Sequence, residues 1–145
     1  MPHFTINISQ AGPLLDVLIG VSQAKAKVLI DAGNPVPKPM LARALVDTGA
    51  SCTVIDPETI KKLGLTPTGI GSTITATTGS VPHDAELYDI SILIPIGSEF
   101  KGFPSVPIMA LDLAPCGIQV LIGRDLLGQG LFIYDGLSKL YTLSF

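Results

Sequence analysis

Charged residues are scarce in this chain of 145 residues, and tryptophan is absent. Charged side chains make up 14% of the sequence and hydrophobic ones 47%, whereas about 25% charged residues is usual in a soluble domain. The net charge is −3, and no basic cluster exists beyond Lys61 and Lys62. Nucleic-acid binding needs a basic stripe, so we expect no nucleic-acid partner. The apolar surplus predicts a surface that self-association covers.

Long hydrophobic runs are missing, and cysteines are few. No apolar stretch approaches the ~20 residues of a membrane-spanning helix, and the N-terminus lacks the basic and apolar regions of a secretory signal. We therefore expect no membrane partner and a cytoplasmic location. Cys52 and Cys116 are too few for a disulfide framework, and with His3 and His83 they form no metal-binding pattern. We expect no metal and no cofactor.

Prolines and glycines separate short runs that are rich in valine, isoleucine, leucine and threonine. This texture predicts strands joined by turns, with a loop at residues 31–39. Such closely spaced strands favour an all-β barrel or sandwich, and no linker divides the chain, so we expect a single domain over residues 1–145. The predicted strands are Phe4–Ile8, Leu14–Val21, Ala26–Ile30, Leu41–Val46, Thr73–Thr77, Val81–Ile94, Phe103–Ala110, Gln119–Ile122, Leu131–Tyr134 and Leu140–Leu143.

Two short helical segments are predicted among the strands. Asp56 suits the N-cap of a helix, and Pro57 suits its first position. Gly64 stands where such a helix ends, so we expect a helix from Pro57 to Leu63. A single helical turn is expected at Arg124–Leu127.

One stretch, ALVDTGAS at residues 44–51, has the features of a catalytic turn. An apolar strand leads into Asp47, and Thr48 and Gly49 follow. Glycine permits a tight turn and a close approach of the backbone. A carboxylate at the end of a rigid strand, with backbone N–H groups nearby, is held as catalysis requires. By itself the Asp-Thr-Gly triplet is equally typical of an ordinary turn.

A second stretch, VLIGRDLL at residues 120–127, carries three apolar residues into Gly123 and a short helical turn. Alone, it is typical of a buried strand that ends at a helix cap. Together, the two stretches resemble the central motifs of the retropepsin family of aspartic proteases, of which HIV protease is the best-known member. In that family the two motifs pack together in a loop that supports the active site.

The resemblance implies a closed β-barrel acid-protease fold with one or two short helices, and it assigns roles to the matching residues. The implied catalytic residues are Asp47, Thr48 and Gly49, supported by Gly123 and Arg124. Leu87–Ile90 lies where the family's flap hairpin returns to the body. The implied substrate-binding and flap residues are Ala50, Ser51, Thr77, Thr78, Gly79, Ser80, Val81 and Ile122, with Val46, Ile70 and Leu121 as further pocket walls.

Three features depart from the viral members of the family. Residues 22–39 predict an insertion before the catalytic strand. Ser51 stands where viral enzymes often carry an aspartate that pairs with the arginine of the second motif, so Arg124 needs another partner. The flap lacks the run of glycines seen in the HIV enzyme. The ends of the chain, residues 3–6 and 141–145, resemble the terminal strands that interleave between retroviral subunits.

The chemistry that the resemblance implies needs two carboxylates, one as a general base and one as a proton donor. The chain contains one Asp-Thr-Gly triplet, so we expect a homodimer in which Asp47 of each subunit meets on a twofold axis. The expected function is an aspartic endopeptidase that activates a water molecule between the two carboxylates. Its substrate would be an extended peptide or protein segment, held as an added strand.

Two other functions fit parts of the sequence. A retropepsin-like fold without turnover would serve as a dimerisation or peptide-binding module, because fold does not determine function. Alternatively, Ser51 or Cys52 would act as a nucleophile with His83 as its base. No G-x-S-x-G turn supports this serine or cysteine hydrolase.

Overall fold

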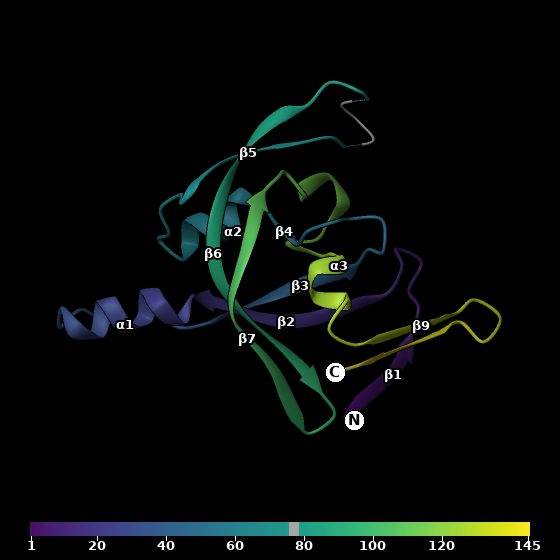
Figure 1. The fold of residues 1–145 in the computed structure, drawn as a ribbon. Helices are drawn as coiled ribbons and strands as arrows, with labels where there is room; N and C mark the ends of the chain where they lie inside the picture. The colour runs from purple at the N-terminus through teal and green to yellow at the C-terminus, as the bar shows by residue number, and fades with distance from the viewer. Residues whose placement is uncertain (76–78) are drawn as a thin grey trace.

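The computed structural model describes residues 1–75 and 79–145, and it is built mainly of strands (Figure 1). Three α-helices and one 3₁₀ turn are found among these residues: α1 (Gln23–Asp31), α2 (Pro57–Lys62), α3 (Arg124–Leu127) and η1 (Ala114–Cys116). The strands are β1 (His3–Asn7), β2 (Leu14–Val21), β3 (Met40–Val46), β4 (Val54–Ile55), β5 (Gly69–Thr73), β6 (His83–Ile96), β7 (Glu99–Ala110), β8 (Val120–Ile122), β9 (Leu131–Asp135) and β10 (Leu140–Ser144).

Six strands form a closed barrel in the order β2-β3-β8-β4-β7-β6. Antiparallel pairing of β2 with β6, from Leu18 opposite Leu93 to Val21 opposite Ile90, closes the ring. The barrel interior is filled by side chains with no exposed surface, as expected for a small barrel. These include Val17, Ile19, Ala44, Ile90, Ile92, Ile94, Val120 and Ile122. The expected all-β barrel is thus confirmed.

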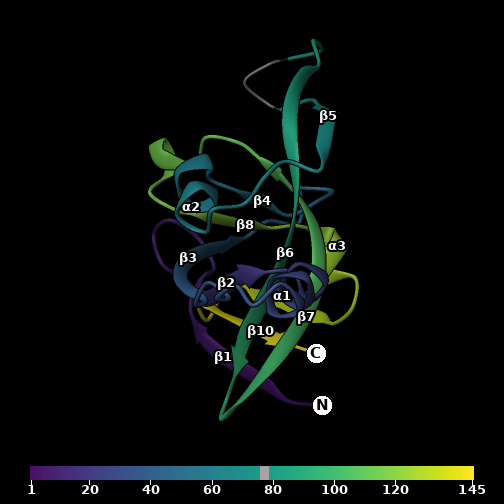
Figure 2. The ribbon, with the colours of Figure 1, turned by 90° about the vertical axis from the view of Figure 1, so that its left-hand side faces the viewer.

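The long strand β6 extends beyond the barrel. Its first residues pair with β5 in an antiparallel hairpin, from Gly69 opposite Leu87 to Thr73 opposite His83. Figure 1 shows this hairpin rising over one end of the barrel, and Figure 2 shows it from the side. The space between the hairpin and the barrel is where the candidate site lies.

The two ends of the chain lie together in a separate three-stranded sheet of order β1-β10-β9 (Figures 1 and 2). The rings of Phe4 and Phe132 each lie 5.9 Å from that of Tyr141, between this sheet and the barrel. β1 pairs with β10 of the same chain, from His3 opposite Ser144 to Asn7 opposite Leu140. β1 therefore pairs with a strand of its own chain, and interleaving of the terminal strands between subunits stays a prediction.

The strand predicted at Ala26–Ile30 is wrong, because these residues belong to α1, which projects from the barrel (Figure 1). The Ser22 hydroxyl accepts a hydrogen bond from the N–H of Lys25 at 3.3 Å and begins the helix. Lys27 and Asp31 form an i,i+4 ion pair at 2.7 Å. Alanine and lysine favour helix, and in α1 they outweigh the β-branched residues near its end. The structure therefore has more helices than the one or two expected.

The first strand of the hairpin was predicted too late in the chain, since β5 covers Gly69–Thr73 rather than Thr73–Thr77. Two glycines weaken the strand signal there. Gly71 is needed for packing: a Cβ at this position would lie 3.0 Å from Cδ2 of Leu87 and 3.1 Å from Cε of Met109. Glycine in a strand often marks such a close approach. In the part of the chain that the structure describes, no helix has the length and apolarity to cross a membrane.

Candidate active site

Asp47 follows the last residue of β3, and the second motif holds that strand end in place. β3 and β8 are parallel neighbours, with Val46 opposite Ile122. The backbone N–H of Asp47 donates to the carbonyl oxygen of Ile122 at 3.0 Å. The two sequence motifs therefore meet side by side in the barrel, as the resemblance implied.

The turn after β3 fixes the Asp47 carboxylate. The N–H of Gly49 donates to Oδ1 of Asp47 at 2.7 Å, and the N–H of Ala50 donates to the Asp47 carbonyl at 3.3 Å. A Cβ on residue 49 would lie 3.0 Å from Oδ1, so glycine allows this contact without displacing the carboxylate. Thr48 is exposed, and its hydroxyl has no hydrogen-bond partner among the described residues.

Arg124 and Gly123 lie against the back of this turn. Nη1 of Arg124 donates to the carbonyl of Thr48 at 2.9 Å and to that of Gly49 at 3.4 Å. The Arg124 N–H donates to the carbonyl of Ala50 at 2.9 Å. Gly123 is buried, and a Cβ there would come within 2.5 Å of the Cys52 carbonyl group. Backbone carbonyls thus take the place of the aspartate that viral relatives supply to the arginine.

A polar pair of the buried Thr53 and the partly buried Asp125, which sequence reasoning missed, continues this support. Thr53 is fully buried. Its hydroxyl donates to Oδ1 of Asp125 at 2.8 Å, and its N–H donates to Oδ2 at 2.9 Å. The same hydroxyl accepts from the N–H of Gly123 at 3.2 Å. Asp125, the second residue of α3, also accepts from the N–H of Leu126 at 3.0 Å. Only its place at the start of a helix signals this role in the sequence.

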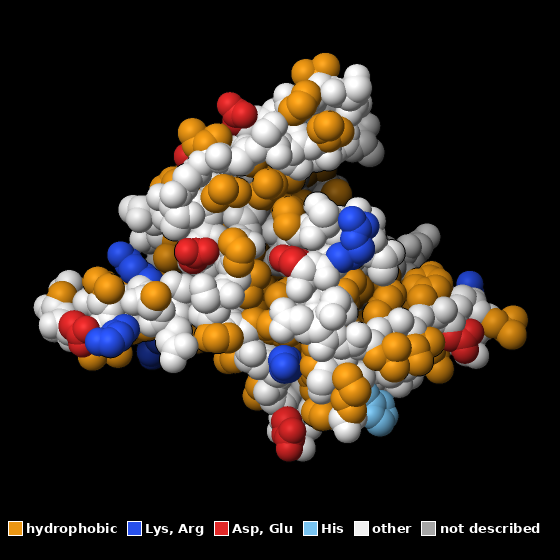
Figure 3. Space-filling model, viewed as in Figure 1, with side chains coloured by type: hydrophobic (Ala, Val, Ile, Leu, Met, Phe, Trp, Pro, Cys, Tyr) orange, Lys and Arg blue, Asp and Glu red, His pale blue; other side chains and the backbone are white. Residues whose placement is uncertain are grey.

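A cleft of about 350 Å³ opens at the Asp47 carboxylate, beneath the β5–β6 hairpin. Figure 3 shows hydrophobic side chains gathered along the hollow between the hairpin and the barrel. Among the described lining residues, Asp47 supplies the only charged side chain. The lining residues are Asp47, Gly49, Ala50, Ser51, Cys52, Val54, Thr73, Ile74, Thr75, Leu111 and Leu121.

Larger hollows lie elsewhere, but their chemistry is different. One of about 530 Å³ lies against α1 and contains no acidic side chain. Another of about 450 Å³ lies beside β1. Its one carboxylate, Asp16, is paired with Arg43 at 2.6 Å. The cleft at Asp47 therefore joins a carboxylate that has no ion pair within the described part of the chain to a mainly apolar lining, which is the usual composition of a substrate site.

Of the residues expected to form the pocket walls, one lines the cleft, two are buried in the core, and two are exposed elsewhere. Leu121 lines the cleft, whereas Val46 and Ile122 point into the barrel core and are buried. Ile122 has no exposed surface in this structure, and contact of Ile122 or of its neighbour Leu121 with a ligand stays a prediction. Ile70 and Val81 are exposed but do not line the cleft. Cleft residues that the sequence did not single out are Val54, Thr73, Ile74, Thr75 and Leu111.

Of the four residues expected at the tip of the hairpin, the structure describes two, Gly79 and Ser80. Thr77 and Thr78 lie outside the described residues. Gly79 and Ser80 are exposed, and Gly79 has a φ of 62°, as a turn glycine does. Their contact with a ligand stays a prediction.

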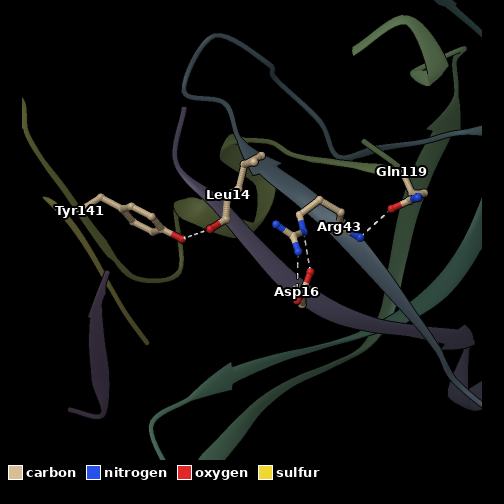
Figure 4. A network of polar contacts seen from close by, with 5 residues as sticks. All are labelled: Leu14, Asp16, Arg43, Gln119 and Tyr141. Atoms are coloured by element: carbon tan, nitrogen blue, oxygen red, sulfur yellow. Dashed lines mark hydrogen bonds and ion pairs between the residues drawn. The ribbon is translucent and has the colours of Figure 1, made fainter. Parts of the chain in front are cut away.

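A polar network on the far side of β3 joins the terminal sheet to the barrel (Figure 4). The hydroxyl of Tyr141 donates to the Leu14 carbonyl at 2.6 Å, and burial raises the pKa of this phenol. Arg43 pairs with Asp16 across β2 and β3. Its N–H donates to the side-chain oxygen of Gln119 at 2.7 Å, just before β8. The network holds β2, β3 and β8 together, and β3 ends at Asp47.

The arrangement does not suit a serine or cysteine nucleophile. No hydrogen bond joins His83 to Ser51 or Cys52 within the described residues, and Nδ1 of His83 is buried without a partner there. Burial, followed by the charge of Asp125, raises the pKa of the Cys52 thiol, although a hydrogen bond with Ser51 opposes this shift. A raised pKa makes a thiol less nucleophilic at neutral pH. Among residues 1–75 and 79–145, no three metal-binding side chains cluster.

The fold and sequence were compared with those of known proteins. A retropepsin-like aspartic protease from Rickettsia conorii has a similar crystal structure, with a TM-score of 0.59 and 22% identity over 99% of this chain and 90% of that one. The retroviral protease-like domain of Ddi1 from Leishmania major gives a TM-score of 0.42 and 16% identity over 85% of this chain and 82% of that one. The search of curated proteins found no match.

The first of these similarities shows that the fold is retropepsin-like. The sequence model of the aspartyl protease family matches residues 26–126, which include the first motif and all but the last residue of the second. The chain therefore belongs to the aspartyl protease family.

Proposed function

We propose that the chain is an aspartic endopeptidase that works as a homodimer, with one Asp47 carboxylate from each subunit. The position of Asp47 carries this proposal: its carboxylate is fixed by the Gly49 N–H at 2.7 Å and faces an apolar cleft. One chain supplies one such carboxylate, and the chemistry needs two. The exposed hydroxyl of Thr48 remains available for a hydrogen bond to the partner subunit.

Two carboxylates about 3 Å apart cannot both ionise, so they share one proton. The ionised carboxylate takes a proton from a water molecule as the water oxygen bonds to the carbonyl carbon of the peptide. The protonated carboxylate gives its proton to the carbonyl oxygen. In the second step the ionised carboxylate takes a proton from one hydroxyl of the tetrahedral diol as the carbon–nitrogen bond breaks, and the protonated carboxylate gives its proton to the leaving amine. The proton count returns to its starting value.

The cleft favours an extended peptide with uncharged side chains near the cleaved bond. Val54, Leu111 and Leu121 line it, while Ser51 and Cys52 add only weakly polar groups. A charged substrate side chain here would lose water without gaining an opposite charge. The β5–β6 hairpin would cover the peptide as a flap and bond to its backbone.

Cleavage of a mixed peptide library at about pH 4 to 7 tests the proposal. The wild-type chain is compared with Asp47→Asn, and sedimentation confirms that both are dimers. We expect Asp47→Asn to dimerise without cleaving. Asp89→Asn is the matched control, because this exposed carboxylate lies on β6 outside the cleft, and it should cleave normally. If Asp47→Asn still cleaves peptides, the protein is not an aspartic protease that uses Asp47. A dimeric wild type that cleaves nothing would instead support a binding module.

A further inference from the structure

His83 lies on the face of the β5–β6 hairpin that looks toward the candidate active site. It is the first residue of β6 and pairs with Thr73, the last residue of β5. Residues directly opposite each other in an antiparallel pair point to the same face of the sheet. Because Thr73 lines the cleft at Asp47, His83 also projects from the side of the hairpin that covers the cleft.

The burial of the neighbouring residues agrees with this orientation. Successive side chains of a strand point to opposite faces. Ala85 shares the face of His83 and is buried, whereas Asp84 and Glu86 point the other way and are exposed. Within the paired part of the hairpin, the face toward the cleft is therefore apolar apart from Thr73 and His83.

The imidazole of His83 carries a polar atom without a partner. Nδ1 is buried, and no described residue forms a hydrogen bond with it. An unpaired buried polar atom costs free energy, so its presence in a native structure needs an explanation. Natural sequences break this rule mainly at functional sites. Because His83 as a whole keeps some exposed surface, a peptide beneath the hairpin can reach the ring.

The charges around His83 indicate which partner would suit it. Histidine side chains gain a proton as the pH falls from about 8 to 5, and both ring nitrogens then donate hydrogen bonds. No charged residue occurs from Thr73 to Pro82. In the described cleft lining, the titratable groups are Asp47 and Cys52. Neither ion pair of the described residues includes His83 or Asp47, so a protonated His83 would be a cation without a bonded anion of its own chain.

We infer that His83 is a specificity-determining residue that binds an acidic side chain of the peptide at a position flanking the cleaved bond. A carboxylate supplies an acceptor for the Nδ1 hydrogen and an opposite charge, and charge-assisted hydrogen bonds are stronger than neutral ones. The position flanks the cleaved bond because His83 does not line the part of the cleft at Asp47. This inference rests on the proposed function, which places a peptide beneath the hairpin. It adds one acidic subsite to a cleft that otherwise favours uncharged side chains.

Paired peptides test this subsite. A peptide that the wild type cleaves is prepared with glutamate and with glutamine at each flanking position in turn. At one position we expect kcat/KM for the glutamate peptide to be about tenfold higher at about pH 5. The ratio of the two kcat/KM values should fall toward one as the pH rises above about 7, where histidine is neutral. Both peptides use the same dyad, so titration of the dyad cancels in this ratio.

His83→Leu should abolish the preference for glutamate at every pH, because leucine forms no hydrogen bond. Its Tm should not fall, since the change removes a buried atom that has no partner among the described residues. His83→Asn keeps a hydrogen-bonding group but takes no proton, so any preference that remains should not change with pH. It also serves if His83→Leu unfolds.

Asp84→Asn is the matched control, because Asp84 is the next residue of β6 and points to the outer face of the hairpin. It should keep the wild-type ratio and its dependence on pH. A preference for glutamate that survives in both His83 variants, or that Asp84→Asn removes equally, would overturn the inference. So would a wild-type ratio near one at every position, or one that does not change with pH.

Binding and cleavage are measured separately, so the two proposals fail separately. Fluorescence anisotropy gives the dissociation constants of the glutamate and glutamine peptides for Asp47→Asn, with and without His83→Leu. If the wild type cleaves nothing, a library peptide that it binds is used instead. Tighter binding of the glutamate peptide that depends on His83, without cleavage by the wild type, keeps the subsite and counts against the protease. Cleavage without a preference for glutamate keeps the protease and overturns the subsite. A chain that neither binds nor cleaves peptides overturns both.

Discussion

Nη1 of Arg124 donates a hydrogen bond of 2.9 Å to the carbonyl oxygen of Thr48, the residue that follows Asp47. The same nitrogen lies 3.4 Å from the carbonyl of Gly49. One cation of the second motif therefore holds two successive carbonyls of the first motif. Because Asp47 moves with this turn, the position of its carboxylate depends on a residue 77 positions later in the chain.

Arg124→Ala should lower kcat about tenfold or more, because small displacements of a catalytic group are costly. KM should change little, since Arg124 does not line the cleft. Lys27→Ala is the control: it removes the exposed ion pair with Asp31 on α1, outside the cleft, which is worth at most about 1 kcal/mol. Steady-state kinetics on one cleaved peptide measure both effects. Equal losses in the two variants would contradict a specific role for Arg124.

Gly123→Ala should destabilise the fold by about 1–3 kcal/mol, as overpacking does. The added Cβ would meet the carbonyl carbon and oxygen of Cys52 at 2.5 Å, and backbone atoms have little freedom to move away. Urea unfolding measures the change. Gly69→Ala is the control, because its Cβ would meet only Cδ1 of Leu87 at 3.9 Å. If Gly123→Ala is as stable as the control, the backbone at Cys52 must be able to move away from the added Cβ at little cost in free energy.

Thr53→Val should cost about 1–3 kcal/mol, because it leaves the buried Gly123 N–H and one Asp125 oxygen without the threonine hydroxyl. In a chain of this size, each kcal/mol lowers the Tm by about 2–4 °C. The matched change Thr5→Val removes an exposed hydroxyl bond to Thr142 and should shift the Tm far less. Calorimetry measures the Tm of both variants. Equal shifts would contradict the idea that a buried hydrogen bond stabilises the fold more than an exposed one.

Cys52 should react slowly with iodoacetamide at about pH 8, where an ordinary thiol is partly ionised. Its pKa is raised, mainly by burial, so less thiolate is present at any given pH than in the unfolded chain. The rate should approach that of the urea-unfolded chain as the pH rises through the folded pKa. Mass spectrometry of the Cys52 peptide gives both rates. Equal rates near neutral pH would show that the thiol is not shielded.

The same reaction is a poor test for a cysteine protease, because Cys52 lines the cleft and a bulky adduct would block it. Replacement by Cys52→Ala separates the two cases. Loss of a nucleophile would abolish turnover, whereas loss of a lining thiol would mainly alter KM for the peptide.

Cleavage should be fastest at mildly acid pH, because the reaction needs one proton shared by two carboxylates. As the pH rises, the dyad loses that proton and has no acid. In strong acid both carboxylates are protonated and no base remains. The predicted profile of kcat/KM against pH is therefore bell-shaped. Asp89→Asn should leave its shape unchanged. A profile that is flat from acid to alkaline pH would contradict a carboxylate pair.

Local signals in the sequence sufficed for many elements. The apolar run Leu14–Val21 was predicted with the bounds of β2, and the cap Asp56 with Pro57 predicted the start of α2. Such signals act over a few residues, so they are readable without the fold. They failed at Ala26–Ile30, where helix-forming residues and a serine cap outweigh a β-branched run. They failed again at β5, whose glycines are explained only by the side chains of Leu87 and Met109.

The sequence by itself determined the turn that carries Asp47: Asp47, Thr48 and Gly49 are adjacent in the chain, and glycine at its third position lets the turn close on the carboxylate. Tertiary structure alone decided what surrounds that turn. Leu111 reaches the cleft because β4 pairs with both β7 and β8, and Thr53 meets Asp125 across 72 positions of sequence. Likewise, β10 lies between β1 and β9, so β1 and β9 are the outer strands of this sheet among the described residues. Contacts of this kind depend on which distant strands pair, and strand pairing is decided by burial of the whole core.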